Sequence, residues 1–206
     1  MTSEGYREVE YTPTSVKDLL VEMKDISEHI VDLAYAAVVF DSDDLGAEVR
    51  KLEERMDYLR YQIRMIALMA SRTKEDAERL AGILQVASAA ETISNGAGDI
   101  VDLLEQRIEA RPFLPFVLQD ADEKLRVTRL ADGSTMAGCA IGELRVESET
   151  GMRIIALRRG RRWIYDPEGE VALRTGDLLI LRGTEDGFQR LARYATGEEA
   201  WPEGRS

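Results

Sequence analysis

Apolar residues recur every three to four positions over most of the first 110 residues, a spacing that predicts amphipathic helices. The first helix is expected to begin after a cap at Thr14 or Ser15. Its apolar face is Val16, Leu19, Leu20, Met23, Ile26, Ile30, Leu33 and Ala37. The polar run 41–44 ends this helix and caps a second, and residues 71–73 cap a third that is expected to extend from about Lys74 to Ala110. Its inward residues are predicted to be Leu80, Ile83, Leu84, Ala87, Ile93, Ala97, Ile100, Val101 and Leu104.

Three long helices with two short links predict an antiparallel up-down-up bundle. The segment 111–115, Arg-Pro-Phe-Leu-Pro, ends the third helix because proline cannot continue a helix and disfavours helix in the residue before it. We therefore expect a loose N-terminus at 1–12, a bundle at 13–110, a second domain at 111–197 and an acidic tail at 198–206.

The second domain has the pattern of a small α+β fold. β-prone runs lie at 124–131, 153–157, 163–165 and 178–182, and turn signals rich in Gly, Pro and Asp separate the last three. These connections are too short for crossover helices, so the pattern predicts an antiparallel meander. Residues 140–144 are expected to form one helical turn, and residues 184–194 a helix.

Charge and composition exclude several classes of function. The chain of 206 residues has a net charge of −12, of which −11 falls in the first 110 residues (12 basic against 23 acidic side chains). An acidic surface argues against nucleic acid as a partner, because phosphate binding depends on Lys and Arg. We find no P-loop, zinc-protease motif or catalytic triad pattern and predict that the chain is not an enzyme. A secretory signal and a long apolar span are also missing from the sequence, which predicts a cytoplasmic location.

Carboxylates on two of the predicted helices form a candidate metal site. Glu28 and Asp32 are four residues apart, about 40° around the helix axis. On the third helix, Glu91 and Asp99 share a face with Asn95 and Asp102. Oxygen ligands suit Mg²⁺, Ca²⁺, Mn²⁺ or iron, so Glu28, Asp32, Glu91 and Asp99 are the candidate ligands. The alternative is a solvated face or ion pairing with arginines of the second helix, which are Arg50, Arg55, Arg60 and Arg64.

Two further features of this half need a structural explanation. Gly96 and Gly98 lie inside the third helix, where each glycine costs about 1 kcal/mol relative to alanine, so a neighbouring helix is expected to approach closely there. His29 is the single histidine of the chain. One histidine does not make a typical zinc site, so we expect His29 to form surface or interhelical hydrogen bonds.

The bundle resembles the PhoU family, whose motif is an acidic residue followed by Asp four positions later on adjacent helices. The sequence E28-H-I-V-D32 matches this motif, whereas N95-G-A-G-D99 and E91-T-I-S-N95 each lack one carboxylate. About one PhoU repeat is covered, at residues 13–110.

The second domain resembles TrkA-C, the C-terminal half of RCK potassium-regulatory units. The resemblance rests on IGELRV at 141–146, TGMRIIALRR at 150–159, Pro167 and RTGDLLILRG at 174–183. It implies control of potassium transport through a membrane channel or transporter, with a homodimer or dimer of dimers as the assembly. The Gly-rich fingerprint of the nucleotide-binding RCK N-terminal half is missing, so NAD or ATP binding is not expected.

Some TrkA-C domains bind cyclic di-AMP at a dimer interface, and this implies a ligand near the backbone of Ile154 and Ile155 and the side chain of Arg158. The basic cluster 158–162 is either a solvated turn or an anion site, because Arg presents paired donors to phosphate. Two other functions stay open: a PhoU-type metal-sensing regulator of phosphate uptake, and a dimeric adaptor without a ligand.

Overall fold

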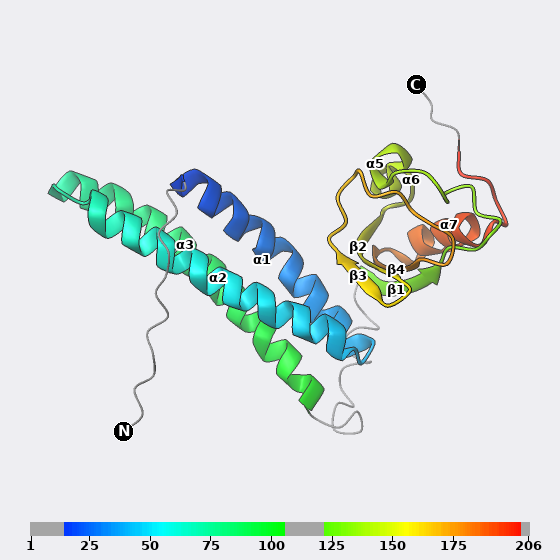
Figure 1. Ribbon diagram of the computed structural model, residues 1–206, viewed down its shortest axis with the longest axis horizontal. Coiled ribbons are helices and arrows are strands. Elements are labelled where there is room, and N and C mark those ends of the chain that lie inside the picture. Colours follow the sequence, from blue (N-terminus) through cyan, green and yellow to red (C-terminus); the bar gives the residue numbers. More distant parts are fainter. Residues whose placement is uncertain (1–14, 106–121, 203–206) are drawn as a thin grey trace.

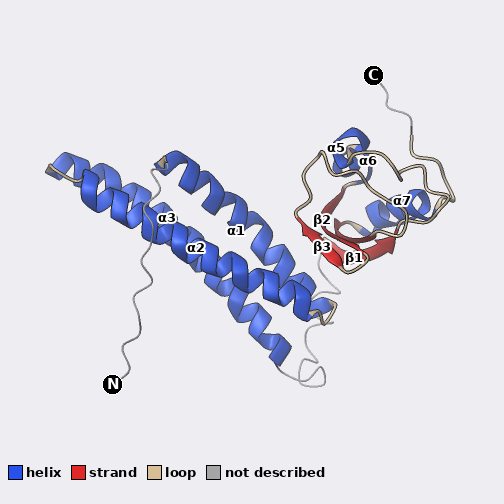
Figure 2. Cartoon of the chain, viewed as in Figure 1, coloured by secondary structure: helices blue, strands red, loops and turns tan. Residues whose placement is uncertain are grey.

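The computed structural model describes residues 15–105 and 122–202, and it shows the predicted α+β architecture. Three long helices come first, and a four-stranded antiparallel sheet with short helices follows (Figures 1 and 2). The proposed domain boundary near residue 111 and the loose N-terminus lie outside the described residues.

The helices of the bundle begin at the residues that the caps predicted. Helix α1 (Val16–Val39) follows Ser15, α2 (Asp43–Ala70) follows Ser42, and α3 (Lys74–Val101) follows Thr73. Each cap side chain accepts a backbone hydrogen bond from the first turn, which satisfies a donor that has no partner within the helix. A short 3₁₀ helix, η1 (Asp102–Glu105), continues α3, and the expected extension to Ala110 lies beyond the described part.

The buried face of α3 differs from the predicted one. Ala87, Ala97 and Val101 are buried as expected, but Ile93 is 46% exposed. The interior positions between them are instead occupied by Glu91 and Ser94. Small and polar residues face the neighbouring helices because α3 approaches α2 closely: a methyl group at Gly98 would overlap the carboxylate of Glu53. The expected close approach is therefore found at Gly98 and not at Gly96, which has open space around it.

The sheet consists of β1 (Lys124–Arg129), β2 (Met152–Arg159), β3 (Arg162–Tyr165) and β4 (Leu178–Gly183), in the order β1-β4-β2-β3. The predicted meander is wrong beyond the β2–β3 hairpin, because β4 pairs with β2 and β1 and not with β3. Helices α5 (Ile141–Leu144) and α6 (Val146–Thr150) precede β2, and α7 (Glu185–Thr196) follows β4.

The segment between β3 and β4 explains this topology. It does not turn back at once but crosses to the other side of β2, where Ala172 bridges to Ala140 and Leu173 is fully buried. Asp177, also fully buried, ends the segment; it accepts two hydrogen bonds from Arg159 and one from the backbone N–H of Arg174. A turn prediction treats residues 166–177 as local structure, whereas the burial of Leu173 and Asp177 depends on the rest of the domain.

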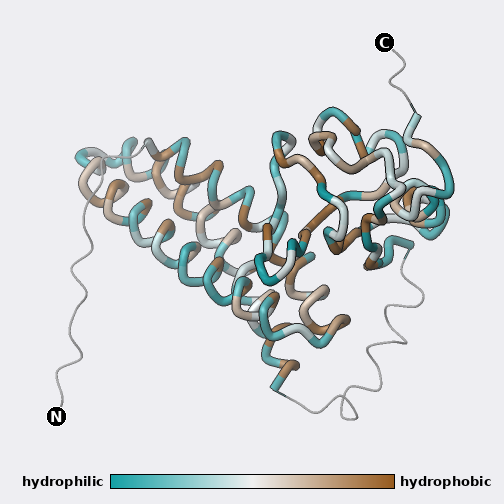
Figure 3. Tube along the Cα trace, turned by 45° about the vertical axis from the view of Figure 1, so that its right-hand side comes forward, coloured by the Kyte–Doolittle hydropathy of each residue, from teal (hydrophilic) through white to brown (hydrophobic). Residues whose placement is uncertain are grey.

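The two faces of the sheet are buried in different cores. One face packs against α5, α6 and α7, with Met152, Leu157 and Leu179 among its buried residues. The other face contributes Ile155, Ala156 and Ile180 to the same buried cluster as the apolar residues of α1 and α2. Figure 3 shows the sheet against one end of the helical bundle. The bundle and the sheet thus share a continuous hydrophobic core. Among the helices of the described ranges, we find none whose length and apolar character suit a membrane span.

Candidate functional site

A cavity of about 440 Å³ opens beside the beginning of β2. Strand β3 pairs with β2 from Ala156 onward, so the preceding residues of β2 have β4 as a partner on one side and the cavity near the other. The cavity is lined by the α5–α6 corner, the start of β2 and the turn after β3: Ile141, Arg145, Val146, Glu147, Ser148, Met152, Arg153, Ile154, Asp166 and Pro167.

Arg145 and Arg153 give this cavity two guanidinium groups. Arg145 separates α5 from α6 in a left-handed backbone conformation (φ 49°), and its exposed side chain has no hydrogen-bond or ion-pair partner within 15–105 and 122–202. Arg153 is half-buried and contacts Asp166 and His29. Guanidinium groups match phosphate oxygens in pairs, so Arg145 and Arg153 are candidate phosphate ligands, while Glu147 and Asp166 give the same cavity two carboxylates. Sequence reasoning did not single out either residue, although Arg145 lies within the quoted IGELRV motif.

The structure distributes the three predicted ligand residues over two faces of β2. Ile154 lines the cavity, whereas Ile155 belongs to the core shared with the bundle. The carbonyl of Ile155 accepts a hydrogen bond from the backbone N–H of Asp166. Arg158 stacks on the ring of Trp163, with its guanidinium carbon 5.5 Å from the ring centroid. Regular alternation would place Arg158 on the same face as Ile154, but a bulge shifts the register of β2 between Ile154 and Ala156. Arg158 therefore lies on the face of Trp163 and is not among the residues that line the cavity.

His29 connects the cavity to helix α1. Its Nε2 lies 2.8 Å from Oδ2 of Asp166, and its Nδ1 lies 3.0 Å from Nη2 of Arg153. The guanidinium of Arg153 can only donate, so Nδ1 accepts and Nε2–H donates to Asp166; this is the pattern of a neutral imidazole. The hydrogen bond from His29 is the main reason that the pKa of Asp166 lies below its ordinary value. The expected hydrogen-bonding role of His29 is thus seen, but with the sheet as its partner.

A second ion pair joins α1 to the sheet. Nη1 of Arg182 in β4 donates to Oδ1 of Asp32 at 3.0 Å. Asp32 is 8% exposed and its Oδ2 has no partner among the described atoms, so burial raises its pKa despite the nearby guanidinium. Arg182 also lies 3.3 Å from Glu123, which leaves it shared between two carboxylates.

Two aromatic residues of β3 also contact the helical bundle, at the beginning of α2. The Nε1–H of Trp163 donates to Oδ2 of Asp44 at 3.1 Å, and the hydroxyl of Tyr165 donates to the carbonyl oxygen of the same residue at 3.4 Å. Burial raises the pKa of Tyr165 to about 12. These contacts fix the beginning of α2 against the hairpin.

The four carboxylates of the candidate metal site do not form one group. Three of them have separate cationic partners: Lys24 for Glu28 (2.8 Å), Arg182 for Asp32, and Arg60 for Glu91. Asp99 is exposed on the surface of α3. Within the described part of the chain, no three Asp, Glu, His or Cys side chains come together as metal ligands. Glu91 is therefore paired with an arginine of the second helix, Arg60, as the ion-pair alternative predicted.

Comparison with known families assigns the two halves separately. The PhoU domain model matches residues 20–104, and the TrkA-C domain model matches residues 125–196. An uncharacterized transporter of Synechocystis sp. is 32% identical over 71 residues, which is 34% of this chain and 12% of that protein. The chain therefore spans about an eighth of the length of this curated relative.

Two solved RCK C domains are similar to part of this chain. The RCK_C domain dimer of S. agalactiae BusR in complex with c-di-AMP is 28% identical, with a TM-score of 0.33, and covers 34% of this chain and 92% of that one. The RCK C domain of the potassium transport protein KtrA, also in complex with c-di-AMP, is 25% identical with a TM-score of 0.34 and covers 41% of this chain and 96% of that one. Together, the two family matches and the α+β architecture show that this chain joins a PhoU domain to a TrkA-C domain.

Proposed function

We propose that this protein is a cytoplasmic regulatory subunit of cation transport, with potassium as the cation and a membrane channel or transporter as the partner. In this proposal a nucleotide binds the TrkA-C domain and changes its contact with the PhoU domain. The pairing of the two domains supports a regulatory role, since neither half contains a recognisable catalytic motif.

One observation carries the proposal: the cavity and the interdomain contact share residues. Asp166 and Arg153 line the cavity, and both contact His29 of α1. A ligand that draws Arg153 toward itself must compete with His29 and Asp166 for the same guanidinium. Ligand binding and domain contact are then coupled, because a ligand that binds more tightly when Arg153 is released from His29 favours the state in which this contact is broken.

The ligand that we propose is cyclic di-AMP, as the TrkA-C resemblance implies. Its phosphates suit the guanidinium groups of Arg145 and Arg153, and the apolar side chains of Ile141 and Ile154 offer a surface for a base. Each chain offers one such cavity, and cyclic di-AMP consists of two equal halves. We therefore propose that two copies of the chain share one ligand in a homodimer.

The test is calorimetry of the full chain with cyclic di-AMP. Charge-assisted hydrogen bonds contribute about 1.5–3 kcal/mol each, so Arg153→Ala is expected to weaken binding at least tenfold. Arg161→Ala is the matched control, because Arg161 is an exposed arginine in the β2–β3 turn.

Two results would contradict the proposal. The first is no heat of binding at millimolar ligand, which would leave a dimeric adaptor without a ligand. The second is equal binding by wild type and Arg153→Ala, which would separate the ligand site from the contact with His29.

A further inference from the structure

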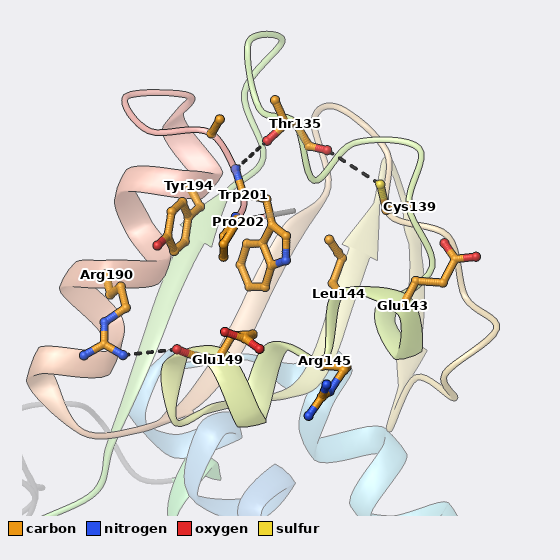
Figure 4. Close-up of a pocket in the computed structure, with 11 residues that line it drawn as sticks. Thr135, Cys139, Glu143, Leu144, Arg145, Glu149, Arg190, Tyr194, Trp201 and Pro202 are labelled. Carbon is orange, nitrogen blue, oxygen red and sulfur yellow. Dashed lines mark hydrogen bonds between the residues drawn. The ribbon is translucent and has the colours of Figure 1, made fainter. Parts of the chain in front are cut away.

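A second, larger cavity of about 880 Å³ lies in the TrkA-C domain between α7, the α5–α6 corner and the segment after α7 (Figure 4). Arg145 contributes to both cavities, and the other lining residues of this one are different. They are Thr135, Cys139, Glu143, Leu144, Glu149, Arg190, Tyr194, Ala200, Trp201 and Pro202. Ligand pockets in proteins commonly occupy about 300–1,000 Å³, so this cavity is large enough for a small molecule.

The segment after α7 is held in place at defined points. Gly197 ends α7 with a positive φ of 80°, and a Cβ there would collide with the backbone of Gly133, so the chain turns back where only glycine fits. Arg193 then pairs with Glu199 at 2.8 Å, and the backbone N–H of Trp201 donates to Oγ1 of Thr135 at 2.7 Å. These contacts determine where the indole of Trp201 lies.

The indole of Trp201 lies in the middle of the cavity (Figure 4). It packs edge-to-face against Tyr194, with ring centroids 4.9 Å apart and planes 64° apart. Trp201 remains partly exposed. A flat aromatic ring from a ligand can therefore stack against it.

Charged groups of both signs surround this aromatic centre. Arg190 donates one hydrogen bond, to the backbone carbonyl of Glu149 at 3.1 Å, and Arg145 has no partner in the part of the chain that is described. Glu143 accepts one hydrogen bond, from the backbone N–H of Ala140, and has a second carboxylate oxygen for another donor. An apolar ligand does not suit four charged side chains, and a plain inorganic anion does not suit two carboxylates.

We propose that this second cavity binds a mononucleotide. The base stacks on Trp201, the phosphate pairs with the guanidinium groups of Arg190 and Arg145, and an exocyclic amine donates to Glu143 or Glu149. This inference stands on the geometry around Trp201 and does not depend on a ligand in the cavity beside β2.

The test uses the fluorescence of Trp201 and AMP as the probe. The chain has two tryptophans, so Trp163→Phe leaves Trp201 as the single reporter. We expect AMP to quench the fluorescence of Trp201 saturably. Adenosine, which lacks the phosphate, and ribose 5-phosphate, which lacks the base, should each bind at least tenfold more weakly. Arg190→Ala should weaken AMP binding about tenfold, and Arg161→Ala should leave it unchanged. No saturable change at millimolar AMP, or equal binding by Arg190→Ala, would overturn the proposal.

Calorimetry separates this site from the first one and does not rely on tryptophan. Trp201→Phe retains a ring and should bind AMP within a few-fold of wild type, whereas Trp201→Ala should bind at least tenfold more weakly, with circular dichroism showing that both fold. Arg153→Ala should leave AMP affinity unchanged. Arg145 lines both cavities, so displacement of AMP by cyclic di-AMP does not distinguish them. If Arg153→Ala abolishes AMP binding, or if Trp201→Ala leaves it unchanged, the nucleotide does not occupy the second cavity and the proposal is refuted.

Discussion

The imidazole of His29 lies 2.8 Å from the carboxylate of Asp166, and this contact joins the first helix of the PhoU domain to the wall of the cavity in the TrkA-C domain. Arg153 completes the group by contacting the other ring nitrogen of His29 and the other oxygen of Asp166. All three residues therefore take part in one hydrogen-bond network. Under the proposed function, a ligand in the cavity is therefore expected to change the interdomain contact.

The loss of thermal stability at acidic pH should depend on Asp166. Its folded-state pKa is lowered, chiefly by the hydrogen bond from His29, so its contribution is present above the unfolded value of about 4 and is lost as pH falls through the folded pKa. We expect Asp166→Asn to melt at a lower temperature than wild type near neutral pH. This difference should shrink as pH falls below about 4. Thermal melts from pH 3 to about 8 measure it, and a difference that is constant with pH would contradict the assignment.

Removal of Arg182 should destabilise the chain by leaving a buried charge on Asp32. Breaking a fully buried ion pair costs about 3–5 kcal/mol. The Arg182 side chain is 36% exposed, so we expect about 2 kcal/mol for Arg182→Ala.

Urea unfolding tests this value against a double variant. Arg182→Ala with Asp32→Asn should recover part of the loss, because no buried charge remains without a partner. Lys24→Ala removes the exposed pair with Glu28 and should change stability much less than Arg182→Ala does. Equal effects of Arg182→Ala and Lys24→Ala would refute the distinction between a buried and an exposed pair.

Divalent metal should not stabilise the PhoU domain through Glu28, Asp32, Glu91 and Asp99. Three of these carboxylates already have a cationic side chain as partner, so a metal would have to displace Lys24, Arg182 or Arg60. We expect the same melting temperature with Mg²⁺, Mn²⁺, Fe²⁺ or chelator, since a ligand stabilises only when it binds the folded state more tightly. A rise with metal that Asp32→Asn abolishes would restore the metal-sensing alternative.

The helical half could be predicted closely from the sequence because its signals are local. Ser15, Ser42 and Thr73 mark the helix starts by capping, and the apolar period marks the faces of α1 and α2. The apolar period did not predict the buried face of α3 correctly, because Ile93 is exposed. There the close approach at Gly98 and the pairing of Glu91 with Arg60 determine the buried face, and both depend on the neighbouring helix.

The sheet topology and the candidate site were harder to predict from the sequence, because they depend on contacts between segments that are distant in the chain. The β2–β3 hairpin follows from its short turn, but the position of β4 depends on the burial of Leu173 and Asp177. Arg158 was expected at the ligand because the TrkA-C resemblance implies it, but the bulge between Ile154 and Ala156 places it against Trp163 instead. The contact between His29 and Asp166 has no local signal in the sequence.

The protein should form a homodimer or a dimer of dimers. β1 and β3 are the edges of the sheet, and the start of β2 has a strand partner on one side within the described segments. Exposed strand edges favour association, and a ligand shared by two cavities requires it. Light scattering at tens of micromolar should give at least twice the mass of 23.1 kDa, whereas a monomer at this concentration would rule out the shared site.

The affinity of cyclic di-AMP for His29→Ala, relative to wild type, tests the coupling most directly. His29 lies outside the cavity lining but competes for Arg153, so its removal should free the guanidinium for phosphate. A hydrogen bond with a charged partner is worth about 1.5–3 kcal/mol, so the account predicts binding about tenfold or more tighter than wild type. Lys24→Ala, on the same helix, should leave the affinity unchanged. Calorimetry that shows equal affinities for His29→Ala and wild type would contradict the coupling between the ligand cavity and the helical bundle.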